Sequence, residues 1–280
     1  MKVAIIIKEL VTKYNFVFKK KWGQNFLIDN NILKKIVAHA NVDKDTIVIE
    51  IGTGAGTLTR ALIPYCKQVI SYEIDLGLKP YLEKEMGSNK NLEIIFDDFL
   101  NRDLQKDIAQ YSYKKMAVVA NLPYYITTPI ITKIVNEDLP LEDIVIMIQK
   151  EVCERLLAKP NTKAYNSLSI FIDYYFEARK LFTVKRHSFW PPPTVDSVVI
   201  KLKRRKEKKV SVTNEDAFFK FVREAFKYKR KTLKNNLKNY PLEQIEAVLQ
   251  RWGHDLMIRA EGLSIEQLAA IYNKISQEKP

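Results

Sequence analysis

Four consecutive residues, Asn121-Leu122-Pro123-Tyr124, combine a carboxamide, a restricted backbone and a flat aromatic ring. The oxygen of a carboxamide can accept a hydrogen bond from the exocyclic amine of an adenine, and Tyr124 can stack on the base. Proline restricts itself and the residue before it, so a neighbouring main-chain carbonyl can accept from the same nitrogen. Two acceptors would pull that nitrogen toward tetrahedral geometry and expose its lone pair to an electrophilic methyl group, without a strong base. The alternative interpretation is a strand that ends in a proline turn.

A glycine-rich loop precedes this segment in the chain and reads Glu50-Ile-Gly52-Thr-Gly54-Ala-Gly56. Glycines permit positive φ and a close approach between backbone and ligand. A dinucleotide fingerprint needs the spacing G-x-G-x-x-G, and here the third glycine comes one residue early. An acid before G-x-G-x-G instead resembles the S-adenosylmethionine loop of class I methyltransferases. We therefore assign Glu50, Gly52 and Gly54 to a cofactor site.

Two further acids follow the next two predicted strands. Glu73 can accept hydrogen bonds from both hydroxyls of a ribose, and Asp98 can accept from the amine of the cofactor adenine. Asp75 and Asp97 lie beside them, and we expect these two to be solvated strand ends or helix caps. The order of loop and acids predicts a nucleoside site at the carboxyl ends of successive strands.

Alternating strands and helices must position these residues. Short apolar runs predict strands at residues 46–51, 69–74, 92–96, 116–120 and 144–148. Helices are predicted from a cap at Asp29 or Asn30, near 57–65, over 76–86 and from the fifth strand to residue 158. The alternation indicates a parallel sheet with helices on both faces, entered through an irregular lead-in at 22–28.

The C-terminal part of the chain differs in pattern. Residues 168–176 and 195–202 are predicted as further strands at a sheet edge. From about Asn214 the pattern is helical, with an apolar stripe that includes Phe218 and Phe221, followed by a basic helix over 227–234. We predict an N-terminal arm with the lead-in at 1–28, an α/β catalytic domain at 29–205 and a small all-helical domain at 206–280.

The charge is concentrated at the two ends of the chain. The net charge is +13, and residues 201–280 carry 19 Lys and Arg against 10 Asp and Glu. The first 21 residues hold six lysines and one acid. A nearly neutral centre with basic flanks is typical of a catalytic domain that grips a polyanion at its margins. For the run at 201–209 alone, a solvated linker is an equal alternative.

Other residue types exclude several classes of protein. Two cysteines cannot form a disulfide framework or a four-ligand zinc site, and three histidines are scattered, so we expect no metal. No stretch approaches 18 apolar residues, and the short apolar run at 3–7 lacks the features of a secretory signal. We expect a cytoplasmic protein without a membrane anchor.

The chain resembles the ribosomal RNA adenine dimethylase family, and most closely its small-subunit branch. The matching segments run in family order over nearly the whole chain. They are GQNFLID at 23–29, EIGTGAGTLT at 50–59, EID at 73–75, NLPYYITTPI at 121–130, QKEVCERL at 149–156, KAYNSLS at 163–169, FWPPPTVDSVV at 189–199, KRKTLKNNL at 229–237 and RAEGLS at 259–264.

This resemblance implies a fold and a set of contacts. The fold is a Rossmann-like class I S-adenosylmethionine-dependent methyltransferase sheet with a small helical C-terminal domain. The implied cofactor contacts are Asn25, Leu27, Gly52, Glu73, Asp98 and Asn121. The target adenine lies against Asn121, Leu122, Pro123 and Tyr124, and Phe189 closes the other face of the base.

The sequence departs from the family pattern at a few positions. Trp22 replaces a smaller residue, and could stack on RNA or pack in the protein. Thr53 and Ala55 stand where Pro and Leu are frequent, which affects loop stiffness more than chemistry. Asn166 occupies a usual Gly position, and Thr194 replaces a common Lys. None of these changes touches the proposed donors and acceptors.

The resemblance also implies the substrate. Small-subunit members dimethylate two adjacent adenosines in the 3′-terminal hairpin of 16S rRNA during maturation of the 30S subunit, and the sibling branch methylates one large-subunit adenosine and confers macrolide resistance. A monomer is expected, with phosphates contacted by the basic helix at 227–234 and by the N-terminal lysines. The other classes considered are a non-catalytic ribosome-assembly factor that binds RNA and a nicotinamide-dependent dehydrogenase.

Overall fold

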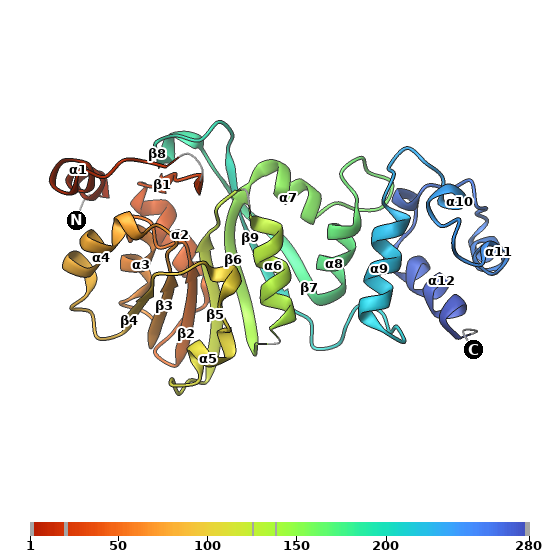
Figure 1. Cartoon of the computed structure of the whole chain (residues 1–280), viewed down its shortest axis with the longest axis horizontal. Helices are drawn as coiled ribbons and strands as arrows, with labels where there is room; N and C mark the ends of the chain where they lie inside the picture. The colour runs from red at the N-terminus through yellow and green to blue at the C-terminus, as the bar shows by residue number, and fades with distance from the viewer. Residues whose placement is uncertain (1–2, 20–21, 125, 138, 278–280) are drawn as a thin grey trace. The chain divides into compact units, whose positions relative to one another are not determined.

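The computed structural model of the protein describes residues 3–19, 22–124, 126–137 and 139–277 (Figure 1). The chain divides into two compact units. The sheet unit comprises Met1–Cys153 and Arg179–Arg204, and the helical unit comprises Glu154–Ala178 and Arg205–Pro280. Of the six N-terminal lysines, Lys2, Lys20 and Lys21 lie outside the described residues.

A seven-stranded sheet has the order β4-β3-β2-β5-β6-β9-β7. The strands are β2 Thr46–Ile51, β3 Gln68–Tyr72, β4 Leu92–Ile95, β5 Lys115–Asn121, β6 Leu141–Gln149, β7 Phe176–Val184 and β9 Ser197–Arg204. Strands β2 to β6 pair in parallel, and β9 pairs antiparallel with β6. The chain proceeds outward from β2 through β3 to β4 and in the opposite direction from β5 to β6. The switch point between β2 and β5 is where open α/β sheets bind ligands, beyond the carboxyl ends of the strands.

The sequence explains why β2 lies at the centre of the sheet. Its six residues, Thr46–Ile51, are all buried, as expected for a β-branched run covered on both faces. The same bounds were predicted from the sequence, and the prediction is confirmed. The strand places Glu50 next to Ser71 of β3 in the parallel register.

Two helices cover one face of the sheet. Apolar residues of α2 (Asn30–Ala40) and α3 (Thr57–Leu62) pack in one core cluster with Val48 of β2 and Val119 of β5. The predicted cap of α2 is confirmed, because Asp29 Oδ1 accepts from the backbone of Asn31 and Ile32. Helix α6 (Thr127–Asn136) lies in front of the sheet in Figure 1. The other α-helices that the structure describes in this unit are α1 Val3–Tyr14, α4 Lys79–Met86 and α5 Leu104–Ile108. Helix α7 (Lys150–Leu156) spans the limit between the two units, which falls after Cys153.

A short two-stranded pair was not predicted from the sequence. Strand β1 (Phe26–Leu27) pairs antiparallel with β8 (Phe189–Trp190), so that Leu27 lies opposite Phe189. This pair joins the lead-in to the segment that contains the three consecutive prolines. The lead-in is therefore partly extended rather than wholly irregular.

The helical unit has its own apolar core. Its helices are α8 Ser167–Tyr175, α9 Glu215–Ala225, α10 Leu233–Asn236, α11 Leu242–Leu249 and α12 Ile265–Gln277. Phe218 and Phe221 of the predicted stripe are fully buried in this core. Tyr165, Ile170 and Tyr174 belong to it as well, so residues 154–178 group with the C-terminal helices. The division into units therefore differs from the predicted domain limits of 29–205 and 206–280.

Two predictions of secondary structure are wrong. Residues 168–176 were predicted as a strand, but they form most of α8, which starts with a capping box between Asn166 and Ser169. The strand begins only at Phe176. The basic segment 227–232 is not helical but forms turns and bends between α9 and α10. Among the residues that the structure describes, every helix is too short or too polar to cross a membrane.

The cap of α2 gives a test of the local fold. We expect Asp29→Ala to lower the free energy of unfolding by about 1 kcal/mol, because the first turn loses a side-chain acceptor. Denaturant unfolding of this variant should be compared with that of Asn31→Ala, an exposed position in the same turn. Equal unfolding midpoints for the two variants would contradict the assignment of the cap.

Candidate cofactor and base-binding site

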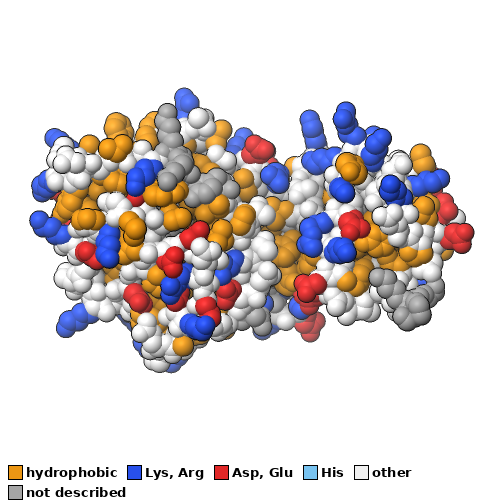
Figure 2. All heavy atoms as spheres, in the orientation of Figure 1, with side chains coloured by type: hydrophobic (Ala, Val, Ile, Leu, Met, Phe, Trp, Pro, Cys, Tyr) orange, Lys and Arg blue, Asp and Glu red, His pale blue; other side chains and the backbone are white. Residues whose placement is uncertain are grey.

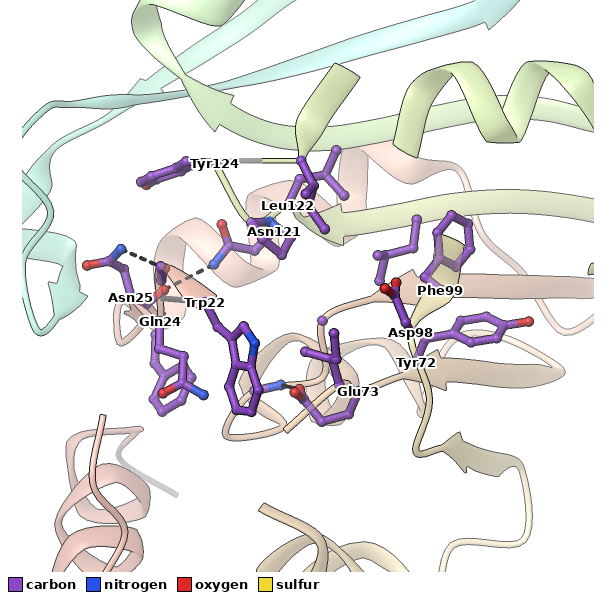
Figure 3. A pocket seen from close by; sticks show the side chains of 18 of the residues that line it. Trp22, Gln24, Asn25, Tyr72, Glu73, Asp98, Phe99, Asn121, Leu122 and Tyr124 are labelled. Atoms are coloured by element: carbon purple, nitrogen blue, oxygen red, sulfur yellow. Dashed lines mark hydrogen bonds between the residues drawn. The ribbon is translucent and has the colours of Figure 1, made fainter. Parts of the chain in front are cut away.

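A cavity opens at the carboxyl edge of the sheet, at the switch point between β2 and β5 (Figure 3). Nine of the residues predicted for the site line it. They are Asn25, Gly52, Gly54, Glu73, Asp98, Asn121, Leu122, Pro123 and Tyr124. They come from the lead-in and from the ends of four strands, so the order of the strands brings together residues that are far apart in the sequence.

The glycine loop forms one wall of the cavity. Gly52 has φ +83° and Gly54 has φ +55°, conformations that L side chains rarely adopt. The Gly52 amide donates to the carbonyl of Tyr72 at 2.9 Å, and the Gly54 amide donates to Glu73 Oε2 at 2.7 Å. A Cβ atom at Gly54 would lie 3.0 Å from the ring of Phe26, so a side chain there would collide with the lead-in. Gly52 and Gly54 both line the cavity, so the backbone of the loop borders it without a side chain at these two positions.

Glu73 is held in place by two main-chain donors. Besides the Gly54 amide, the Asp75 amide donates to Glu73 Oε1 at 2.8 Å. The side chain is 5 % exposed, and burial raises the pKa of Glu73 to about 7, opposed by these amide hydrogen bonds. Each carboxylate oxygen keeps a second lone pair for a ligand. This geometry fits the pair of hydroxyls on a ribose.

Asp98 follows β4 and caps a short 3₁₀ helix, η3 (Phe99–Asn101). Its Oδ1 accepts from the Leu100 amide at 2.9 Å. The side chain lines the cavity at a position separate from Glu73 (Figure 3). With Oδ1 fixed by the backbone, Oδ2 can accept from an amine of a bound nucleoside.

Asn121 ends β5, and one hydrogen bond sets the orientation of its carboxamide. Asn121 Nδ2 donates to the carbonyl of Asn25 at 3.2 Å. The Oδ1 atom is consequently turned the other way and lies on the side of Tyr124 (Figure 3). The Pro123 carbonyl accepts from the Ile126 amide and from Thr127 Oγ1, each at 3.3 Å. The Leu122 carbonyl is therefore our candidate for the second acceptor beside Asn121 Oδ1.

Tyr124 is anchored through its hydroxyl. The Tyr124 Oη and Ser197 Oγ atoms lie 2.7 Å apart, and Ser197 at the start of β9 is fully buried. Burial raises the pKa of Tyr124 above its ordinary value, so the phenol is neutral at physiological pH. A fixed aromatic ring beside Asn121 is suited to stacking on a base.

Three predicted site residues do not line this cavity. Leu27 and Phe189 are register partners in the β1–β8 pair, and both are buried in the core cluster that contains α2 and α3. In this conformation Phe189 does not close over a base. Glu50 is fully buried beneath the loop, where its Oε2 accepts from Thr59 Oγ1 at 2.6 Å and from Ser71 Oγ at 2.7 Å.

Sequence reasoning assigned no cofactor contact to several residues near the cavity. Trp22 and Gln24 line it, and Gln24 is hydrogen-bonded to Asp75, which does not line it. Asp75 was expected to be either a solvated strand end or a helix cap. It caps the 3₁₀ helix η2 (Leu76–Leu78), and it is not solvated, because its exposed fraction is 0 %. Its carboxylate accepts from Gln24 Nε2 at 2.7 Å and from Lys19 Nζ at 2.6 Å. These bonds tie the lead-in to the end of β3, and no local sequence signal identifies the partners.

The residues present fit S-adenosylmethionine. The cradle offers a bare backbone at the glycine loop and two acids at separate positions, which match a nucleoside with ribose hydroxyls and an adenine amine. Across the described ranges, no group of three or more His, Cys, Asp or Glu side chains could hold a metal ion. The sheet order, the loop and the acids together define a class I S-adenosylmethionine-dependent methyltransferase.

Comparison with known proteins narrows this class. The model of a family described as ribosomal RNA adenine dimethylase matches residues 15–277, and the chain belongs to this family. It is 42 % identical to the ribosomal RNA small subunit methyltransferase A of Oceanobacillus iheyensis, over 96 % of this chain and 94 % of the relative. It is 47 % identical to the protein of the same name from Bacillus pumilus, over 96 % of this chain and 95 % of the relative.

Two solved structures share the fold over most of the chain. The dimethyladenosine transferase from Plasmodium falciparum has a TM-score of 0.72 and 29 % identity, with 90 % of this chain and 98 % of that chain covered. The 23S rRNA methyltransferase ErmE has a TM-score of 0.68 and 27 % identity, with coverage of 90 % and 100 %. The predicted α/β methyltransferase fold with a helical C-terminal part is confirmed.

Glu50 gives a test of the buried acid beneath the loop. Burial raises the pKa of Glu50 from 4.5 to about 8, so between these pH values the folded protein holds a proton that the unfolded chain has released. Stability should fall as pH rises through this window, by up to about 1.4 kcal/mol per pH unit. Glu50→Gln keeps the acceptor and cannot ionise. We therefore expect this variant to lack the part of the pH dependence of stability that comes from Glu50.

The measurement is denaturant unfolding of both proteins across the window from weakly acidic to weakly alkaline pH. Glu73 titrates in both proteins, so the informative quantity is the difference between their free energies of unfolding. We expect this difference to change steadily with pH in favour of Glu50→Gln. A difference that is independent of pH would show that Glu50 does not hold a proton in the folded protein.

Proposed function

We propose that this protein transfers methyl groups from S-adenosylmethionine to the N6 atoms of two adjacent adenosines in the 3′-terminal hairpin of 16S rRNA. The reaction takes place in the cytoplasm on a precursor of the 30S subunit, by a monomer that needs no metal. The observation that carries this proposal is the orientation of Asn121, whose amide nitrogen is used by Asn25 and whose oxygen faces the Tyr124 side of the cavity.

The residues of the chain act by holding the adenine amine. Asn121 Oδ1 and the Leu122 carbonyl accept its two hydrogens, and Tyr124 stacks on the ring. When bound, S-adenosylmethionine supplies an electrophilic methyl group on a sulfonium sulfur, in a cavity whose acids Glu73 and Asp98 bind its nucleoside. Transfer of the methyl group to N6 would break the bond from its carbon to sulfur and leave S-adenosylhomocysteine. The N6 proton, made acidic by the new C–N bond, would pass to water, so no strong base is required. Positioning and electrostatics can provide most of the rate enhancement.

Recognition of RNA would use the basic surface of the helical unit. Five basic residues in the turns after α9 and in α10 are exposed: Lys227, Lys229, Arg230, Lys231 and Lys234. Figure 2 shows Lys and Arg side chains gathered on this unit. Basic side chains on one surface can bind the phosphates of RNA. Such contacts provide affinity that does not depend on the nucleotide sequence. The target adenosine must leave its stack to reach Asn121, which favours a hairpin loop over a regular duplex.

The large-subunit branch of the family is the second candidate. The relatives at 42 % and 47 % identity carry the name of a small-subunit enzyme, whereas ErmE, a 23S rRNA methyltransferase, is 27 % identical. This difference favours the small subunit. A purely non-catalytic assembly factor would not need Asn121 and Tyr124 held by hydrogen bonds on the cavity.

The substrate can be tested directly. The protein should be incubated with S-adenosylmethionine labelled in the methyl group and with either unmethylated 30S particles or large-subunit RNA, and the labelled nucleotide should be mapped. We expect two labelled adenosines near the 3′ end of the small-subunit RNA, each dimethylated at completion. Label confined to a single large-subunit adenosine would assign the protein to the other branch.

Asn121→Ala tests the acceptor. We expect the methyl-transfer rate to fall by about a hundredfold or more, because a preorganised hydrogen-bond acceptor is lost at the reacting nitrogen. The thermal unfolding midpoint should change little, since Asn121 is only partly buried at the end of its strand. Asn136→Ala, at the exposed end of α6, is the matched control. Methylation by Asn121→Ala at the rate of the control would refute the assignment.

A further inference from the structure

A chain of hydrogen bonds between side chains lies beneath the glycine loop, outside the cavity. It runs from Thr53 in the loop to Ser71 on β3 and on to Glu50 on β2. Thr53 Oγ1 and Ser71 Oγ are 2.6 Å apart, and Ser71 Oγ donates to Glu50 Oε2 at 2.7 Å. Because Ser71 uses its proton on Glu50, Thr53 donates to Ser71. Thr59 on α3 completes the chain by donating to the same carboxyl oxygen at 2.6 Å.

All four side chains are shielded from water. The exposed fractions are 4 % for Thr53 and 0 % for Glu50, Thr59 and Ser71. Hydrogen bonds between buried groups cannot be replaced by water, so loss of one partner leaves another polar atom unsatisfied. The chain therefore constrains the relative positions of the loop, both strands and α3.

Thr53 connects this chain of hydrogen bonds to the glycine loop, which forms one wall of the cavity. It stands between Gly52 and Gly54, which both line the cavity and both have positive φ. Its carbonyl accepts from the Gly56 amide at 2.9 Å, and its own amide donates to the Tyr72 carbonyl at 3.3 Å. Glycines on both sides permit many backbone conformations. The Thr53 side chain consequently supplies a restraint that neither neighbour can provide.

We propose that Thr53, Ser71 and Glu50 are positioning residues for the cofactor, which hold the glycine loop in its binding geometry without touching the ligand. This inference rests on the proposed function of the cavity. In this inference Glu50 positions the glycine loop from beneath. The sequence had predicted a direct contact between Glu50 and the cofactor. Thr53 also gains a specific function, since its hydroxyl restrains a loop in which the family often has a proline.

The test measures binding of S-adenosylhomocysteine by calorimetry, together with the KM for S-adenosylmethionine and kcat. We expect Thr53→Val and Ser71→Ala each to weaken binding about tenfold and to raise the cofactor KM equally. The value of kcat at saturating cofactor should stay within about twofold, because the Asn121 side of the cavity is unchanged. The double variant should lose little more affinity than either single variant, because both substitutions break the same chain of hydrogen bonds.

Conservative variants and a control separate positioning from loss of stability. Glu50→Gln keeps an acceptor for Ser71 and Thr59 and should bind like the wild type, whereas Glu50→Leu should bind as weakly as Ser71→Ala. Ser169→Ala removes a buried hydroxyl from α8 in the helical unit, where Ser169 Oγ donates to the Arg155 carbonyl at 2.6 Å. This control should lower the unfolding midpoint without affecting cofactor binding.

The outcomes distinguish this inference from the proposed function. If wild-type protein binds no S-adenosylhomocysteine, the function of the cavity is wrong. If the wild type binds and Thr53→Val binds equally well, the positioning chain is refuted while the function stands. A fall in kcat with an unchanged cofactor KM would also refute it. Should Ser71→Ala fail to fold, Thr53→Val decides, because it changes only the loop end of the chain.

Discussion

The chemistry of the site depends on which end of one carboxamide faces the cavity. A carboxamide carries donors on its nitrogen and acceptors on its oxygen, and only the oxygen can receive the hydrogens of an adenine amine. The hydrogen bond from Asn121 Nδ2 to the carbonyl of Asn25 makes this choice. The choice is made by the lead-in, which lies almost a hundred residues earlier in the chain. The contacts that fix the lead-in therefore also fix the orientation of the proposed acceptor, Asn121 Oδ1.

The structure fixes the lead-in from two directions. On one side, buried Asp75 accepts from Gln24 and Lys19, which ties the segment to the end of β3. On the other, Leu27 pairs with Phe189 in the short β1–β8 ladder. The pairing of Leu27 with Phe189 thus holds the backbone of the lead-in in place. The glycine loop is restrained in a similar way from below, so main-chain and buried side-chain contacts set most of the cavity's shape.

Local patterns in the sequence predicted the parts of the fold that depend on local physics. The run at 46–51 is β-branched and mostly apolar, which predicts a buried strand, and Asp29 is a strong cap beside a helical stripe. Residues 168–176 have the composition of a strand, but Ile170 and Tyr174 lie in the core of the helical unit, and the capping box at Asn166 and Ser169 starts a helix. The capping pair Asn166 and Ser169 is the local signal that indicates a helix at this position.

In the site, too, some features depend on local sequence and others on contacts between distant segments. The loop, Glu73, Asp98 and the segment from Asn121 to Tyr124 could be assigned because each follows a strand in an α/β sheet, and parallel strands bring their carboxyl ends to one edge. The burial of Glu50, Asp75 and Phe189 depends on pairings between distant segments, which spacing along the chain does not encode. The basic residues after α9 were predicted to lie on a helix. They lie mostly in turns and bends, where they are exposed as they would be on a helix surface.

The most direct test is a structure of the protein with S-adenosylhomocysteine and an RNA hairpin that carries the target adenosine. We expect Asn121 Oδ1 and the Leu122 carbonyl within hydrogen-bond distance of the adenine N6, about 3 Å. We also expect Asn121 Nδ2 to remain on the Asn25 carbonyl and Tyr124 to stack on the base. An adenine that faces Asn121 Nδ2, or that binds away from the segment Asn121–Tyr124, would contradict the assignment of this site.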